Sequence, residues 1–162
     1  MNQDQKNKKL KKTVTSSLSK GLQGEIFTPG DKSISHRCII LSSLAIGESK
    51  INGLLESADV ICTIKAMKAL GSNINLKSNI CIVNGIGIGS LVEPSAPLDF
   101  GNSGTAARLI MGLVATHPIK SVLIGDESLS KRPMRRVVDP LIEFGAQFNL
   151  NSLEFFPITV NG

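Results

Sequence analysis

The stretch Pro29-Gly30-Asp31-Lys32-Ser33-Ile34-Ser35-His36-Arg37 decides how this chain folds. Its Pro-Gly turn ends a short β-type run, and a helix is predicted to begin at the lysine and serine, with Ser33 as N-cap. The free N–H groups and the positive dipole end of a helix N-terminus attract anions. Lys32 adds an ammonium group there, and Arg37 projects from the same helix face as Ser33. The alternative is an ordinary capped helix with two solvated cations.

Strand and helix patterns alternate around this stretch. Apolar residues at helical spacing predict one helix over 33–46 and another that Ser57 caps and Gly71 ends. Short β-type runs precede, separate and follow these helices. The predicted strands are 22–28, 49–54 and a hairpin of 73–76 with 80–83. A glycine-rich loop from Asn84 to Pro97 then closes a β-α-β-α-β-β unit.

The same order of elements returns in the second half of the chain. Helices are predicted to open at Gly101–Thr105 and at Pro133, the latter kinked or beginning late because Pro140 lies inside its pattern. The predicted strands are 98–100, 121–124 and a closing hairpin of 147–150 with 158–160. We therefore interpret the fold as α/β, with two copies of one unit at about 22–85 and 98–162.

Local sequence similarity supports the duplication. Gly30 to Arg37 and Gly101 to Arg108 share the same glycine–arginine spacing, and Ile82-Val83-Asn84-Gly85 resembles Thr159-Val160-Asn161-Gly162. Each copy thus begins its first helix with a turn suited to anions. Two such turns can face one ligand, which favours a binding role over a purely structural one.

Two further features of the second copy bear on binding. Gly101-Asn102-Ser103-Gly104 permits close approach of a ligand to the backbone, although it matches neither GxGxxG nor a Walker A loop and equally suits a helix-entry turn. Arg132 directly precedes Pro133, which holds it extended and lets it reach toward the same anions. Lys131 and Arg135 are expected to be solvated.

Charge and composition limit the possible partners. Residues 1–20 hold six lysines and one acid, whereas residues 21–162 hold twelve basic and twelve acidic residues. The whole net charge of +5 therefore lies in a Lys-rich tail, which we expect to be disordered. The folded part has no net charge and no large basic face, so nucleic acid is not expected as a partner. No apolar run is long enough to cross a membrane, and no secretory signal is recognisable. The cysteines, Cys38, Cys62 and Cys81, lack metal-ligand spacing, which predicts buried thiols in a reducing cytoplasm and no metal.

Four motifs in order resemble one enzyme family. PGDKSISHR, LLESADV, LDFGNSGTAARL and GDESLSKRPM are similar to the EPSP synthase (3-phosphoshikimate 1-carboxyvinyltransferase) family, with a likeness that runs from about Leu22 to Gly162. LDFGN and GDESLSKRPM look more like the bacterial class that includes glyphosate-tolerant members. The resemblance implies the enolpyruvyl transferase fold, in which each of two lobes is built from three β-α-β-α-β-β units. Two of the three units of one lobe are then present here.

The resemblance also implies a reaction and a set of binding residues. The family transfers the enolpyruvyl group of phosphoenolpyruvate to the 5-hydroxyl of shikimate 3-phosphate, without metal or cofactor, in the shikimate pathway to chorismate and aromatic amino acids. By this likeness Lys32 touches both substrates, and Ser33 and Arg37 hold shikimate 3-phosphate. Phosphoenolpyruvate is bound by Arg132 and by a turn that lines its pocket. The turn residues concerned are Asn102, Gly104 and Thr105.

The family pattern extends beyond this chain. Its third unit carries a further contact to shikimate 3-phosphate, and its second lobe carries the catalytic aspartate, glutamate and lysine. We therefore expect a fragment without catalytic residues, inactive alone unless a C-terminal chain complements it. The family's initial strand, here about Leu22–Phe27, belongs to the other lobe and would lack sheet partners. Two alternatives to this interpretation stay open. One is a non-catalytic module that binds phosphate or polyanions, and the other is a degenerate gene product.

Overall fold

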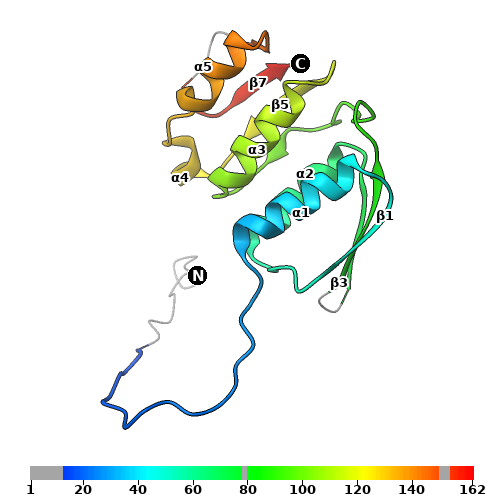
Figure 1. The fold of residues 1–162 in the computed structure, drawn as a ribbon. Coiled ribbons are helices and arrows are strands. Elements are labelled where there is room, and N and C mark those ends of the chain that lie inside the picture. Colours follow the sequence, from blue (N-terminus) through cyan, green and yellow to red (C-terminus); the bar gives the residue numbers. More distant parts are fainter. Residues whose placement is uncertain (1–12, 78–79, 150–153) are drawn as a thin grey trace, which may run out of the picture.

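The computed structural model describes residues 13–77, 80–149 and 154–162. It contains two sheets, each accompanied by helices, as Figure 1 shows. The helices are α1 (Lys32–Leu44), α2 (Ala58–Ala69), α3 (Gly104–Val114), α4 (Glu127–Ser130) and α5 (Arg135–Glu143). The strands are β1 (Ile46–Asn52), β2 (Asn73–Lys77), β3 (Ile80–Ile86), β4 (Leu98–Asp99), β5 (Lys120–Ile124), β6 (Gln147–Phe148) and β7 (Ile158–Asn161).

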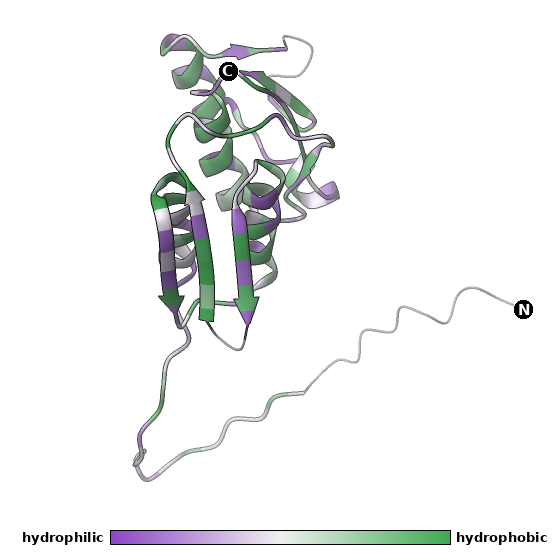
Figure 2. Cartoon of the chain, turned by 90° about the vertical axis from the view of Figure 1, so that its right-hand side faces the viewer, coloured by the Kyte–Doolittle hydropathy of each residue, from purple (hydrophilic) through white to green (hydrophobic). Residues whose placement is uncertain are grey.

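The first sheet holds three strands in the order β1-β3-β2, all antiparallel. Val83 on the central strand lies opposite Ser49 and Ile74, and Val83 and Ile74 are buried. Figure 2 views this sheet face on, with hydrophilic and hydrophobic residues alternating along its strands and helices behind it. This alternation is typical of a sheet with one face on the core and one in solvent.

The second sheet holds four strands in the order β4-β5-β7-β6. β4 and β5 are parallel, whereas β7 is antiparallel to both β5 and β6. The predicted hairpin of β6 with β7 is confirmed by this pairing, although Leu150 at its edge lies outside the described residues. Apart from β4, the two sheets have the same order and directions.

Two glycines occupy matching places in the two sheets. A Cβ added to Gly85, near the end of β3, would collide with the carbonyl oxygens of Ser42 and Ala45 at the C-terminal end of α1. A Cβ added to Gly162, after β7, would collide with the carbonyl oxygens of Val114 and His117 at the C-terminal end of α3. In each half of the chain, a backbone without a side chain therefore packs against the end of the first helix, as an internal repeat predicts.

The hydrophobic core runs through both halves of the molecule. α2 packs against α1 in its own half and against α3 in the other half, so the helices of the two halves form one layer. α3 contributes the fully buried Ala106, Ile110 and Val114, and each large apolar side chain buried in this way stabilises the fold by about 1.5–3 kcal/mol. The loop between the halves is also fixed, because the Gly89 N–H donates to Nε2 of the buried His117 at 3.3 Å.

The strand predicted over 22–28 is wrong. These residues form no strand, and the side chains of Leu22, Ile26 and Phe27 are almost fully exposed. A β-type sequence becomes a strand only when a neighbour receives its backbone hydrogen bonds, and no described strand lies beside this segment. The expectation that the initial strand lacks sheet partners is confirmed.

Several predicted boundaries also change. The first helix ends at Leu44 rather than residue 46, because β1 already begins at Ile46. The glycine-rich loop starts later than predicted, since β3 continues to Ile86. The second-half helix begins at Arg135 rather than Pro133, which confirms the late start, and the short helix α4 before it was not predicted.

The remaining expectations concern the tail, the membrane, metals and thiols. The Lys-rich tail lies mostly in residues 1–12, outside the described residues, and residues 13–20 form no helix or strand. In the described part of the chain, no helix is long and apolar enough to cross a membrane, and no His, Cys, Asp and Glu side chains gather as metal ligands. Cys81 is buried as predicted, but Cys38 and Cys62 are only half-buried, because they lie near helix surfaces.

Candidate anion-binding site

The first turn of α1 is fixed by Asp31 rather than Ser33. The Asp31 carboxylate accepts a hydrogen bond from the Ile34 N–H at 2.7 Å, so Asp31 is the N-cap and the prediction of Ser33 is wrong. The buried Ser35 hydroxyl donates to the Asp31 carbonyl at 2.7 Å and accepts from the Leu55 N–H at 3.0 Å. The cap therefore leaves the Ser33 side chain exposed and available to a ligand.

Lys32 stands beside this turn in an ion pair. Its Nζ lies 2.9 Å from Oδ2 of Asp59 on α2, and the Lys32 side chain is 50% exposed. Ion pairs at such exposed positions contribute only about 0–1 kcal/mol, because water and salt compete for both charges. An anionic ligand can therefore replace or share Asp59 at little cost.

Arg37 lies one turn further along the same exposed face. Its Nη1 donates to the Ser33 carbonyl oxygen at 3.1 Å, which holds the guanidinium back along the helix toward the first turn. Lys32, Ser33 and Arg37 are thus brought together as the sequence predicts, on the solvent-facing side of α1.

His36 lies on the opposite, buried side of this turn. Its Nδ1 is 2.7 Å from the Thr63 hydroxyl on α2, while its buried Nε2 has no hydrogen-bond partner among the described residues. Burial lowers the pKa of His36, and the raising effect of Asp59 only partly opposes this shift. A neutral imidazole therefore connects α1 to α2 beneath the cationic face.

The first turn of α3 is organised by a second cap and a chain of polar contacts. Ser103 is the N-cap, and the adjacent Asn102 bridges two charged groups. The Asn102 Nδ2 donates to both carboxylate oxygens of Asp126 at 3.2 and 3.0 Å, and its Oδ1 accepts from Arg132 Nη2 at 2.5 Å. Hydrogen bonds from the Leu129 N–H and from Asn102 lower the pKa of Asp126, which keeps this chain of contacts charged.

Gly104 is the most crowded position of this turn. A Cβ there would lie 2.6 Å from Nη1 of Arg108, 3.4 Å from Nη1 of Arg132 and 3.5 Å from a methyl group of Leu129. The missing side chain leaves room for two guanidinium groups at the helix N-terminus. Thr105, the next residue, is half-buried.

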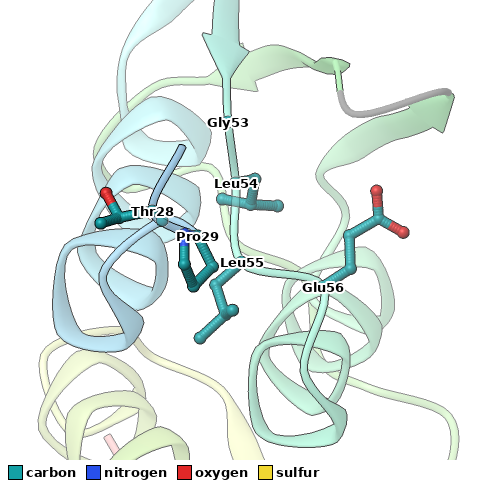
Figure 3. Close-up of a pocket in the computed structure, with 7 residues that line it drawn as sticks. Thr28, Pro29, Gly53, Leu54, Leu55 and Glu56 are labelled. Atoms are coloured by element: carbon teal, nitrogen blue, oxygen red, sulfur yellow. The ribbon is translucent and has the colours of Figure 1, made fainter. Parts of the chain in front are cut away.

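The two turns lie at the same end of the molecule. Figure 1 shows α1 and α3 pointing the same way, and α2 contacts both of them. Two depressions lie at their margins. One of about 490 Å³ lies between Thr28–Gly30 and Gly53–Glu56, as Figure 3 shows, and one of about 730 Å³ is lined by residues of and around α4, from Asp126 to Arg132. The cations are thus placed on an open surface at one end of the folded molecule.

Sequence reasoning missed some residues of this surface. Asp59 pairs with Lys32 and Asp126 orients Asn102, yet neither stands in a pattern that marks such a role. The only sequence signal for Arg108 is its spacing from Gly101, which equals the spacing of Arg37 from Gly30. The sequence pattern identifies the candidate binding residues, and the tertiary structure adds the residues that orient them.

Two halves with a matching order of three strands, each with cations beside the N-terminus of its first helix, give the chain an α/β fold of the enolpyruvyl transferase kind. A model of the family described as EPSP synthase (3-phosphoshikimate 1-carboxyvinyltransferase) matches residues 17–162. The chain therefore belongs to the EPSP synthase family, a family of transferases.

Known relatives agree with this assignment. The chain is 52% identical over 151 residues to the 3-phosphoshikimate 1-carboxyvinyltransferase of Brucella canis and 51% identical to that of Parvibaculum lavamentivorans, matching 93% of this chain. It is similar to the solved EPSP synthase of Acinetobacter baumannii with a TM-score of 0.82 and 37% identity over 86% of this chain. The chain spans about a third of the length of these relatives, 34% and 32% respectively.

Proposed function

We propose that the complete protein transfers the enolpyruvyl group of phosphoenolpyruvate to the 5-hydroxyl of shikimate 3-phosphate, through a tetrahedral adduct that then eliminates phosphate. The observation that carries this proposal is the placement of two cation-bearing helix N-termini at one end of a chain that belongs to the EPSP synthase family. The proposed setting is the cytoplasm.

The roles follow from the two turns. Ser33 and Arg37, on the exposed face of α1, hold shikimate 3-phosphate, and Lys32 between them and Asp59 contacts both substrates. Arg132 binds phosphoenolpyruvate beside Gly104. Asn102 and Thr105 line the same pocket.

Electrostatics gives the reason for this arrangement. Both substrates are anions that repel each other, so they react only where fixed positive groups hold them close. The hydrogen bonds that place these groups exist before any substrate arrives, as between Arg132 and Asn102. No reorganisation of the cations is then needed at the moment of reaction.

This chain matches only a third of its relatives' length, so we assign binding and catalytic groups to different parts of the complete protein. We place the proton-transferring groups in the two thirds of the relatives' length that this chain does not span. This chain alone then binds substrate anions but does not turn them over, and a complementing chain that supplies the remainder restores activity.

A phosphate-release assay tests the proposal. The purified chain with phosphoenolpyruvate and shikimate 3-phosphate should release no more phosphate than buffer does. Adding the remaining two thirds of a relative as a separate chain should restore release, and Arg37→Ala should reduce it. Turnover by the chain alone, or silence of every complemented mixture in which the partner is folded and bound, contradicts the proposal.

A competition experiment separates this function from a general polyanion-binding module. A substrate site prefers shikimate 3-phosphate to inorganic phosphate, because it also contacts the ring hydroxyls. A general module, or a degenerate product, shows no such preference. Displacement of bound shikimate 3-phosphate by inorganic phosphate at equal concentration would support the module.

A further inference from the structure

The loop that joins the two halves of the chain is bound to the first half by its backbone. It runs from the end of β3 to β4, from one sheet to the other, as Figure 1 shows. The Gly87 N–H donates to the carbonyl oxygen of Ala45 after α1 at 3.1 Å. The Val92 N–H donates to the carbonyl oxygen of Leu70 after α2 at 3.0 Å. Both contacts join amide groups, so they do not depend on pH.

The contacts of the same loop with the second half are different, because each uses a side-chain acceptor that can take up a proton. The Gly89 N–H donates to Nε2 of His117 at 3.3 Å, at a position between the two backbone contacts. The Lys120 N–H at the start of β5 donates to Oε2 of Glu93 at 2.9 Å. In the described part of the chain, these are the hydrogen bonds that connect the loop with the second half.

The protonation state of His117 follows from its partners. The residue is buried, with 4% of its surface exposed. Its Nδ1 lies 3.0 Å from the carbonyl oxygen of Leu113 and 3.1 Å from the hydroxyl of Thr116, which itself donates to that carbonyl at 2.8 Å. A carbonyl oxygen, and a hydroxyl whose proton is already used, can only accept, so Nδ1 carries the ring proton. Nε2 is then unprotonated and accepts from the Gly89 N–H.

A second proton on this ring would remove the contact with the loop. The proton would lie on Nε2 and face the Gly89 N–H, so two donors would meet without an acceptor. Buried donors without a partner destabilise a structure, and a buried charge does so more strongly. The closed loop therefore binds one proton fewer than an open loop, in which the histidine contacts water, and acid favours opening.

The charged groups around His117 come from three elements. The C-terminal part of α3, the loop, the start of β5 and the end of β7 meet at this residue, and their charged side chains are Glu93 and Lys120. The Glu93 carboxylate favours a cation at His117, and the Lys120 ammonium group disfavours one. Gly162 packs against the His117 carbonyl oxygen and, as the last residue of the 162-residue chain, adds a carboxylate that also favours the cation. These charges remain when the side chain at position 117 is replaced, so a replacement isolates the effect of the imidazole.

We propose that His117 is a pH-sensitive latch, whose neutral imidazole holds residues 88–91 of the loop against the end of α3 and whose protonation releases them. The backbone contacts at Gly87 and Val92 do not titrate, so they confine the opening to the segment between them. The opening exposes Leu91, which is 7% exposed in the closed loop. The latch lies at the opposite end of α3 from the anion-binding turn, so it does not depend on the proposed function.

Hydrogen exchange of the 162-residue chain at pH 8 and pH 5 tests the latch. Mass spectrometry of overlapping peptides gives the protection of residues 88–91, expressed relative to the exchange of an unstructured peptide at the same pH. We expect this protection to fall about fivefold at pH 5, the factor that the loss of one net hydrogen bond gives. The buried residues of α3 should keep their protection, because the opening is local.

His117→Gln is the variant that isolates the imidazole, because the amide oxygen of glutamine reaches the position of Nε2 and accepts from Gly89 without titrating. In this variant the protection of residues 88–91 should be similar at both pH values. His36→Asn and Glu93→Gln are the matched controls. They remove the other histidine of the chain and the other titratable contact of the loop, and both should keep the fall in protection at pH 5.

Four results would overturn the latch. An equal fall in His117→Gln and in the wild type would assign the pH dependence to other groups, and a fall that disappears in His36→Asn or Glu93→Gln would assign it to those residues. Joint loss of protection in residues 88–91 and in α3 would show global unfolding instead of a local opening. Equal protection of residues 88–91 at both pH values in the wild type would show that the ring does not release the loop. If His117→Gln does not fold, the two controls still decide, since the fall must persist in both.

Discussion

His36 is a residue whose charge state affects the stability of the fold. Its ring is fully buried between α1 and α2, and its pKa is lowered chiefly by that burial. In the unfolded chain the histidine takes up a proton below about pH 6.5, whereas in the folded chain it does so only at lower pH. The unfolded state therefore binds more protons in this window, and stability falls as pH falls.

Replacing His36 by asparagine tests this dependence. The amide of asparagine reaches the position of Nδ1 and can keep the contact with Thr63, but it does not titrate. We expect the free energy of unfolding to fall less between pH 7.5 and 5.5 in His36→Asn than in the wild type. Urea unfolding at both pH values measures it. An equal fall in both proteins would assign the pH dependence to other groups.

Gly104 is the residue that we expect to decide sensitivity to glyphosate. The resemblance to a bacterial class with glyphosate-tolerant members implies that those members carry alanine at the matching position, whereas this chain has glycine. Glyphosate is longer than phosphoenolpyruvate, so a methyl that also displaces the Arg108 Nη1 should exclude the inhibitor more than the substrate. A difference of about 1–3 kcal/mol is typical for such a contact.

Steady-state inhibition of the complemented enzyme measures this effect. The glycine form should be inhibited competitively with phosphoenolpyruvate, and Gly104→Ala should raise the inhibition constant more than the Michaelis constant. Resistance of the glycine form at millimolar glyphosate, or equal shifts of both constants, would show that position 104 does not discriminate between the two ligands.

In each half of the chain, a glycine at the end of a strand packs against the C-terminal end of the first helix and lets the helix lie close to the sheet. A Cβ on Gly85 would collide with the backbone carbonyls at the C-terminal end of α1, which cannot move aside as a side chain can. Gly85→Ala should therefore lower the free energy of unfolding by about 1–3 kcal/mol, the usual cost of overpacking. Gly112 within α3 is the matched control, because nothing lies within 4 Å of an added Cβ.

Gly112→Ala should instead stabilise the chain by about 0.5–1 kcal/mol, since alanine loses less backbone entropy in a helix. Chemical denaturation of both variants measures these changes in the free energy of unfolding. Similar values for the two substitutions would mean that the glycine at the end of β3 serves no packing role.

The elements differ in how far the sequence alone predicts them. Helix α2 was predicted with its cap Ser57 and its stop at Gly71, because caps and apolar spacing are local signals. The N-cap of α1 was not, since Asp31 and Ser33 are both good capping residues and the local pattern does not distinguish them. The segment 22–28 has strand composition but no strand, because pairing depends on a neighbour that composition does not reveal.

The candidate site shows the same division. Lys32, Ser33 and Arg37 follow from one helical turn, so the sequence predicts them directly. Arg108 and Arg132 meet only because α3 and the loop before Pro133 are brought together by the second sheet. Contacts of this kind join residues that are distant in sequence, and no local pattern indicates which arginine faces which helix.

At the scale of the whole molecule, the described chain leaves apolar surface uncovered. On α3, Ala106, Ile110 and Val114 are buried and Leu109 and Leu113 are half-buried, so the exposed large apolar side chains lie on other elements. Ile34 and Leu41 lie seven residues apart on one side of α1 and are 63% and 65% exposed. The exposed Ile46 begins β1, which pairs with a single strand, β3, among the described residues.

We therefore expect the purified chain to self-associate. Burying an apolar side chain of this size is worth about 1.5–3 kcal/mol, and an open strand edge adds a template for pairing. Size-exclusion chromatography with light scattering should show species larger than a monomer. The double variant Ile34→Lys with Leu41→Lys should shift the chain toward a monomer, whereas Phe144→Lys, at an even more exposed but separate position directly after α5, should not. A wild-type monomer that unfolds in one sharp thermal transition would show that this surface needs no cover.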